Sequence, residues 1–156
     1  MVWLWGLGIG AIVLLGLALS SIPVAAWWQR RDARHAIRLF QTRREMLEAK
    51  FFDMAQSQGK PRGLRWLDCE WFNEVTFARD KNSGLLTAFV GINIRFEAIE
   101  GGDMEDVAAV GTIRDAVAVF HFHDGSWGTG GKALFNMNPQ DALEKLVAQF
   151  DPIPLA

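Results

Sequence analysis

The first 29 residues carry no charged side chain, and tryptophan pairs stand near both ends of this apolar run. A helix rises about 1.5 Å per residue and roughly 20 apolar residues cross the hydrocarbon core of a bilayer. Aromatic rings at headgroup depth, followed by arginines, are typical of a membrane anchor. We therefore predict a transmembrane helix over residues 1–29. The expected membrane-interface residues are Trp3, Trp5, Trp27, Trp28, Arg30, Arg31 and Arg34.

A cleavable signal peptide is the alternative, because Val24-Ala25-Ala26 resembles a cleavage site. Signal peptides usually begin with a basic segment and have a shorter apolar core. The cations follow the apolar run, so the positive-inside rule predicts a single-pass protein of the cytoplasmic membrane with its C-terminal domain in the cytoplasm. Export of that domain stays open as the alternative. Gly6 and Gly10 have the spacing of close helix packing in lipid, which suggests a homo-oligomer.

A second helix is predicted over residues 32–57. Its apolar residues recur at intervals of three and four with Arg and Glu between them, and Gly59 marks its end. The apolar face is formed by Ala36, Ile37, Phe40, Leu47, Phe51 and Met54.

From Leu64 the apolar period changes to two, which predicts an antiparallel sheet of four strands over residues 64–137. The residues 86–98 should form a strand with one buried face and one largely polar face. Residues 108–123 and 127–137 should form a hairpin around Asp124-Gly125. The apolar set expected in the first strand is Leu67, Cys69, Trp71, Val75 and Phe77.

A short helix is predicted over residues 139–150, with Asn138 as its N-cap and Pro139 in its first turn. The last residues should form an extended tail. Residues 30–156 then make one soluble α+β domain, in which the residue 32–57 helix packs across the sheet.

The charge is divided along the chain. Residues 1–50 contain seven Lys/Arg and three Asp/Glu, a net charge of +4, whereas residues 51–156 contain nine and fifteen, a net charge of −6. An acidic domain is a poor nucleic-acid binder, because phosphate contacts need clustered cations. The basic stretch over residues 30–44 either faces anionic headgroups or only controls topology.

Two resemblances add to this interpretation. The stretches RREMLEAKFFDMAQSQGKPRGLRW, FEAIEGGDMEDV and ALFNMNP resemble those of bacterial membrane-anchored proteins for which no activity is established. The order of a long helix followed by a meander resembles the cystatin/NTF2-like folds. Those folds host enzymes, binding modules and assembly domains alike, so the resemblance implies an architecture without selecting a function.

Four polar residues are candidates for a ligand-binding face: Arg95, Glu97, His121 and His123. The two histidines alternate in a strand and so share a face, but no spacing typical of a metal site accompanies them. We predict no metal, no cofactor and no catalytic set. Cys69 is expected to be a buried, inert thiol, and SWGTGGKA lacks the spacing of a phosphate-binding loop.

An acidic loop follows the residue 86–98 strand and lacks the ligand spacing of a calcium loop. It is either a solvated connection or a docking surface for a basic partner, formed by Glu100, Asp103, Glu105 and Asp106. The function expected is that of a membrane-anchored, non-enzymatic interaction or assembly module with a protein partner. The alternative is a small-ligand-binding or enzymatic NTF2-like domain with a pocket between helix and sheet.

Overall fold

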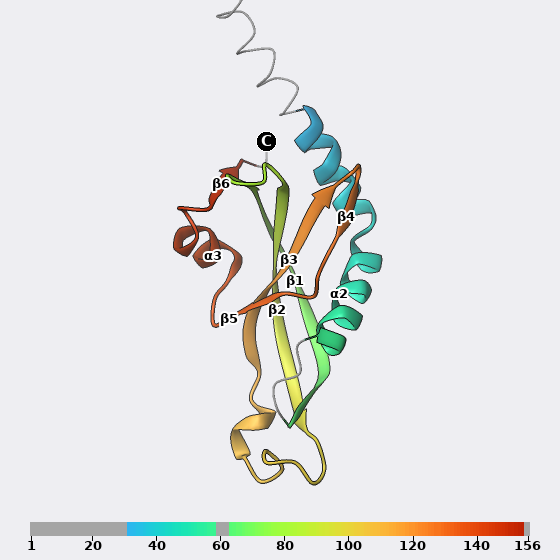
Figure 1. Cartoon of the computed structure of the whole chain (residues 1–156), viewed down its shortest axis with the longest axis vertical. Coiled ribbons are helices and arrows are strands. Elements are labelled where there is room, and N and C mark those ends of the chain that lie inside the picture. Colours follow the sequence, from blue (N-terminus) through green and yellow to red (C-terminus); the bar gives the residue numbers. More distant parts are fainter. Residues whose placement is uncertain (1–30, 59–62, 155–156) are drawn as a thin grey trace, which may run out of the picture. The chain divides into compact units, whose positions relative to one another are not determined.

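The computed structural model describes residues 31–58 and 63–154, and the fold class is α+β, as predicted (Figure 1). The chain divides into two units, residues 1–35 and 36–156, and the second contains the sheet. Within the described ranges, no helix is long and apolar enough to cross a membrane. The transmembrane helix predicted over residues 1–29 lies outside those ranges, as do Trp3, Trp5, Trp27, Trp28, Arg30 and the Gly6/Gly10 pair.

The helix predicted over residues 32–57 is present but is interrupted at Arg43. Residues 31–42 are helical, Arg43 forms a turn, and α2 follows as Arg44–Gln58. The Thr42 hydroxyl donates to the carbonyl of Arg38 (2.9 Å), a contact that often bends helices. The Arg43 amide is shared between the carbonyls of Leu39 and Phe40 (3.1 and 3.2 Å). The interruption is therefore a local tightening of one helix, and both segments turn apolar residues toward the sheet.

Six strands form one antiparallel sheet in the order β4-β3-β2-β1-β6, with β5 also paired to β3. The strands are β1 (Leu64–Asp80), β2 (Leu86–Ala98), β3 (Arg114–His123), β4 (Ser126–Gly128), β5 (Ala133–Phe135) and β6 (Phe150–Ile153).

The prediction of four strands was wrong at three places. The strand expected over residues 127–137 is two short strands, because the glycine-rich segment between β4 and β5 leaves the sheet. The tail forms β6, which pairs with the end of β1. The strand expected from residue 108 starts at Arg114, and a 3-10 turn, η1 (Ala108–Gly111), precedes it.

A β-bulge in β1 explains why Leu67 is not in the core, contrary to prediction. Trp66 pairs with Phe96 while Asp68 pairs with Arg95, so one extra residue lies in β1. Side chains alternate across a strand, and one extra residue therefore reverses which face the preceding residues occupy. Trp66 takes the core position and Leu67 is 52% exposed.

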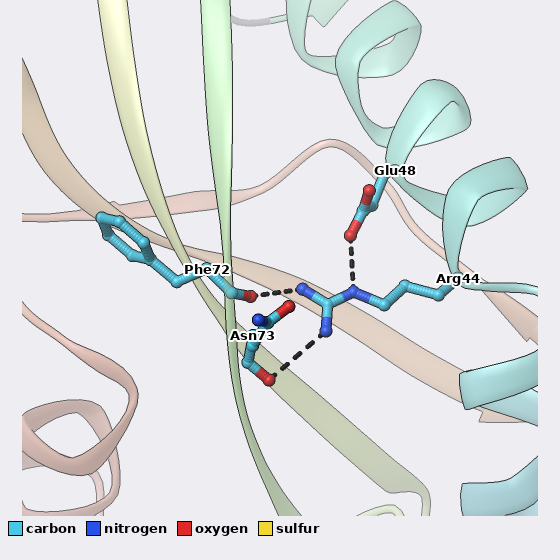
Figure 2. Close-up of polar contacts among 4 residues, drawn as sticks. All are labelled: Arg44, Glu48, Phe72 and Asn73. Carbon is cyan, nitrogen blue, oxygen red and sulfur yellow. Dashed lines mark hydrogen bonds and ion pairs between the residues drawn. The ribbon is translucent and has the colours of Figure 1, made fainter.

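A second irregularity in β1 is held by Arg44 of α2 (Figure 2). Trp71 pairs with Ile92 and Val75 with Val90, so residues 72–74 lie outside the regular ladder. The guanidinium of Arg44 donates to the carbonyls of Phe72 and Asn73. A third guanidinium nitrogen contacts Glu48 at 2.6 Å. These bonds satisfy carbonyls that the irregular strand leaves without partners on β2.

Aromatic rings fill the space between the helix and the sheet. Phe40 contacts Phe120 and Trp127 at centroid distances of 5.4 and 4.9 Å, and Phe51 contacts Trp71 at 5.5 Å. Most of these rings meet at steep angles, the edge-to-face geometry that aromatic pairs prefer. The rings of this interface include Phe40, Phe51, Phe77, Phe96, Phe120, Trp66, Trp71 and Trp127.

The opposite face of the sheet is also partly buried, which corrects the prediction of one largely polar face. Helix α3 (Pro139–Lys145) packs there, opposite α2 (Figure 1). On this face a second buried cluster contains Phe89, Val117 and Val119 of the sheet, Ala142 of α3 and Phe150 of β6. The helix starts at the predicted N-cap, where Asn138 Oδ1 accepts from the amides of Gln140 and Asp141. It ends earlier than predicted, before the turn that leads into β6.

Strand β4 and the segment that follows it lie against the helix. The indole of Trp127 donates to the carbonyl of Ala36 (2.7 Å). Gly131 has a φ of +71°, and a Cβ at this position would be 2.5 Å from the amide nitrogen of Ala55. Both the backbone conformation and the space therefore require glycine at position 131, the second glycine of the Gly130-Gly131 pair in SWGTGGKA.

We expect Gly131→Ala to lower the free energy of unfolding by at least about 2 kcal/mol, because it combines a disfavoured φ with a clash against α2. Urea unfolding of the full-length chain in detergent, followed by tryptophan fluorescence, measures this change. Gly128→Ala is the control, since no atom lies within 4 Å of its added Cβ. Equal stability of the two variants would contradict the close approach.

Candidate functional site

The exposed part of the sheet face that α3 leaves open carries a ladder of charged pairs. Arg65 pairs with Glu97 and Arg95 with Asp68, each across β1 and β2. Asn93 donates to Glu70 (3.3 Å) one step further along. The hydrogen bond from Arg95 is the largest cause that lowers the pKa of Asp68. Arg95 and Glu97 are therefore engaged in pairs that stabilise neighbouring strands.

The candidate histidines lie at the other end of the same face. His121 pairs with Thr87 in the sheet register, and its Nδ1 is 3.2 Å from the Thr87 hydroxyl. His123 Nδ1 is 3.0 Å from an Asp124 carboxylate oxygen at the exposed β3–β4 hairpin. Asp124 and Gly125 both have positive φ, which confirms the predicted turn.

The four residues predicted to form a ligand-binding face do not converge. Thr87, the register partner of His121, is eight positions along β2 from Arg95. At about 3.4 Å per residue, this separation is about 27 Å. The structure instead places these residues in two separate groups, with α3 packed against the sheet between them.

Thr87 belongs to a polar group that the sequence analysis missed. Its hydroxyl contacts the His121 imidazole, and Asp80 is near enough to act on that ring electrostatically, an arrangement of the residue types used in nucleophilic catalysis. Thr87 is 0% exposed, however, so its hydroxyl cannot meet a substrate. The group is therefore structural, and only the β2–β3 register could have revealed it.

Asp80 organises the β1–β2 turn and not the imidazole. Its carboxylate accepts from the amides of Asn82 and Ser83 and from the side chain of Gln149. The hydrogen bond from the Ser83 amide is the largest cause that lowers the pKa of Asp80 to about 2. The turn is thereby tied to the segment that leads into β6.

Cys69 faces the helix side of the sheet and is partly buried. Burial, with the carboxylates of Asp68 and Glu48 nearby, raises the pKa of its thiol to about 12. The thiol is therefore protonated near neutral pH and is a poor nucleophile, in keeping with the predicted inert role.

The acidic residues predicted as a docking surface lie in what we call the distal loop, residues 99–113, at the end of the sheet opposite the β1–β2 turn (Figure 1). Glu100, Asp103, Glu105 and Asp106 are all exposed. Glu105 accepts a hydrogen bond from the amide of Gly101 (2.9 Å) and so shapes the loop. The same loop exposes apolar side chains, which sequence alternation alone did not indicate.

An open groove of about 530 Å³ adjoins this loop. It is lined by Asp53, Gln56, Ser57, Arg65, Trp66 and Ile99. Gln56 donates to the carbonyl of Trp66 (3.3 Å) and so links the end of α2 to the start of β1. The groove lies where the end of α2 meets the start of β1, and Trp66, a ring of the aromatic interface, forms part of its wall.

Across residues 31–58 and 63–154, no three His, Cys, Asp or Glu side chains are grouped as a metal site would require. Comparison with protein-family models, curated proteins and solved structures finds no match to this chain. The resemblances to membrane-anchored bacterial proteins and to cystatin/NTF2-like folds therefore stay predictions.

The His121 environment predicts a specific pH dependence of stability. Partial desolvation of the imidazole, which is still exposed to solvent, lowers the pKa of His121; Asp80 opposes this shift and Lys132 adds to it. The unfolded chain then binds a proton more readily, so stability is full above pH about 6.5 and falls as the pH decreases below that value. We expect His121→Gln to flatten this dependence between pH 7.5 and the onset of carboxylate protonation, about pH 5.

Urea unfolding of the full-length chain at a series of pH values measures the slope. His123→Gln, which removes an imidazole from the exposed hairpin of the same strand, is the matched control with which the slope of His121→Gln is compared. A slope that survives His121→Gln would assign the effect to a different group.

Proposed function

We propose that this chain is a membrane-anchored, non-enzymatic module that binds a protein partner through the surface of its α+β domain. In this proposal the apolar run of residues 1–29 is the anchor, and the arginines that follow it favour a cytoplasmic domain under the positive-inside rule. The observation that carries the proposal is the aromatic interface between helix and sheet.

That interface occupies the position in which the alternative function needs a pocket. Phe51, Phe77 and Phe120 are at most 1% exposed, and ring-to-ring contacts connect them to three tryptophans. A ligand site is usually a concave cavity with a few convergent polar groups. Here the side chains in the centre of the helix–sheet contact are apolar and in contact, and the groove beside Trp66 opens only at the end of that contact, which favours recognition on the outer surface.

The distal loop supports a protein partner on that surface. The distal loop contains four Asp/Glu and no Lys/Arg, with Glu97 before it and Arg114 after it. Glu97 and Glu105 are engaged within the domain, whereas no ion pair within the described residues involves Glu100, Asp103 or Asp106. Such a field attracts a basic protein surface and repels nucleic acid and anionic headgroups.

The test is co-purification of the tagged full-length chain from native membranes in mild detergent. We expect a stoichiometric protein partner. The triple variant Glu100→Gln, Asp103→Asn, Asp106→Asn should lose most of it, because charge complementarity is removed while the Glu105–Gly101 contact is kept.

The matched control neutralises three exposed carboxylates elsewhere, with Glu45→Gln, Glu74→Gln and Glu144→Gln, and should keep the partner. A chain that purifies without any protein partner contradicts the proposed function. If the distal-loop variant still co-purifies the partner, the proposed function is supported, but the distal loop is not the docking surface.

A further inference from the structure

The distal end of the domain gathers exposed apolar side chains. Ile99, Val107 and Ile113 are 42%, 40% and 53% exposed, and all three belong to the distal loop. Leu67, which the bulge of β1 turns out of the core, lies near the start of the same strand pair. Four of the eight large apolar side chains exposed among the described residues are therefore at this end. Clustered exposed apolar residues commonly mark interaction sites.

Ile99 belongs to the distal loop and also lines the groove at the end of α2, so the loop and the groove are adjacent. The groove adds an apolar wall from Trp66 and polar side chains from α2. Loop and groove therefore offer apolar contact beside hydrogen-bonding groups. This combination is typical of interfaces that bind one face of a partner segment.

The charge around these apolar residues selects the occupant. Glu100 follows Ile99 and Asp106 precedes Val107 in sequence, whereas Arg114 follows Ile113. Asp53 lines the groove, and Arg65 is already paired with Glu97. An occupant with anionic groups would be repelled, which excludes a lipid headgroup or a nucleic acid as the favoured partner. A segment that alternates apolar residues with Lys or Arg matches both properties.

We infer that the distal loop and the adjoining groove bind a basic, amphipathic segment of the partner protein. The inference rests on the proposed function and adds the chemistry of the partner. Apolar contacts with Ile99, Val107 and Ile113 supply the affinity, and the carboxylates supply orientation and rate of association.

The test uses the full-length chain in nanodiscs of phosphatidylcholine and a fluorescent peptide built from Leu and Lys in an amphipathic helical pattern. Binding is measured by fluorescence anisotropy against empty nanodiscs. We expect saturable binding that weakens with salt. Two comparison peptides, with Glu in place of Lys and with Ser in place of Leu, should bind about tenfold more weakly or not at all.

Two variants with equal numbers of substitutions locate the site. Val107→Ser with Ile113→Ser should weaken binding about tenfold, whereas Met46→Ser with Val147→Ser, which are also exposed, should not. Because all four side chains are exposed, both variants should keep the wild-type unfolding midpoint, and the charge-neutralised loop variant provides a second, independent perturbation.

Equal binding of the Leu/Glu peptide, or equal loss in the two variants, overturns the inference. Absence of peptide binding by a chain that still co-purifies a partner overturns the inference alone. Absence of both overturns the proposed function as well.

Discussion

The packing of aromatic rings between helix and sheet is the constraint on which the rest of this domain depends. It requires the helical segments on both sides of Arg43 to present Phe40 and Phe51 to the same sheet. It also requires β1 to turn both Trp66 and Trp71 toward the helix, which the bulge between them makes compatible with strand alternation. The packing of the helix on the sheet also positions Arg44, which donates hydrogen bonds to the carbonyls of Phe72 and Asn73 in the irregular part of β1 (Figure 2).

The same packing limits what the domain can do. Aromatic rings fill the space between helix and sheet, so a partner has to be recognised on the outer surface of the domain. Several polar or reactive side chains of the sheet are engaged in contacts within the fold. The Thr87 hydroxyl is held by His121, Asp68 by Arg95, and the Cys69 thiol stays protonated. The distal loop differs, because it exposes apolar side chains and three carboxylates, those of Glu100, Asp103 and Asp106, that take part in no ion pair among the described residues. The proposed interaction role follows from this contrast between an engaged sheet and an open loop.

The parts of the fold that depend on local patterns were predictable from sequence. The residue 32–57 helix, the paired strands, the Asp124-Gly125 turn and the Asn138 cap all have local signals, and all are present. The position of Leu67 and the pairing of β6 were not predictable, because a bulge and an edge pairing depend on distant strands. The four candidate ligand residues lie on one face of the sheet, but strand register places the two histidines far along the strands from Arg95 and Glu97. The strand register depends on distant pairing and was not predictable either.

The central claim is that the distal loop is where this chain meets its partner. The most direct test places a photo-crosslinking amino acid at Val107, or at Met46 on the outer face of α2, in the full-length chain within native membranes. Both side chains are exposed, so both probes can react. The account predicts a discrete protein adduct from Val107 and none from Met46. An adduct from Met46 alone, or no protein adduct from Val107, contradicts it.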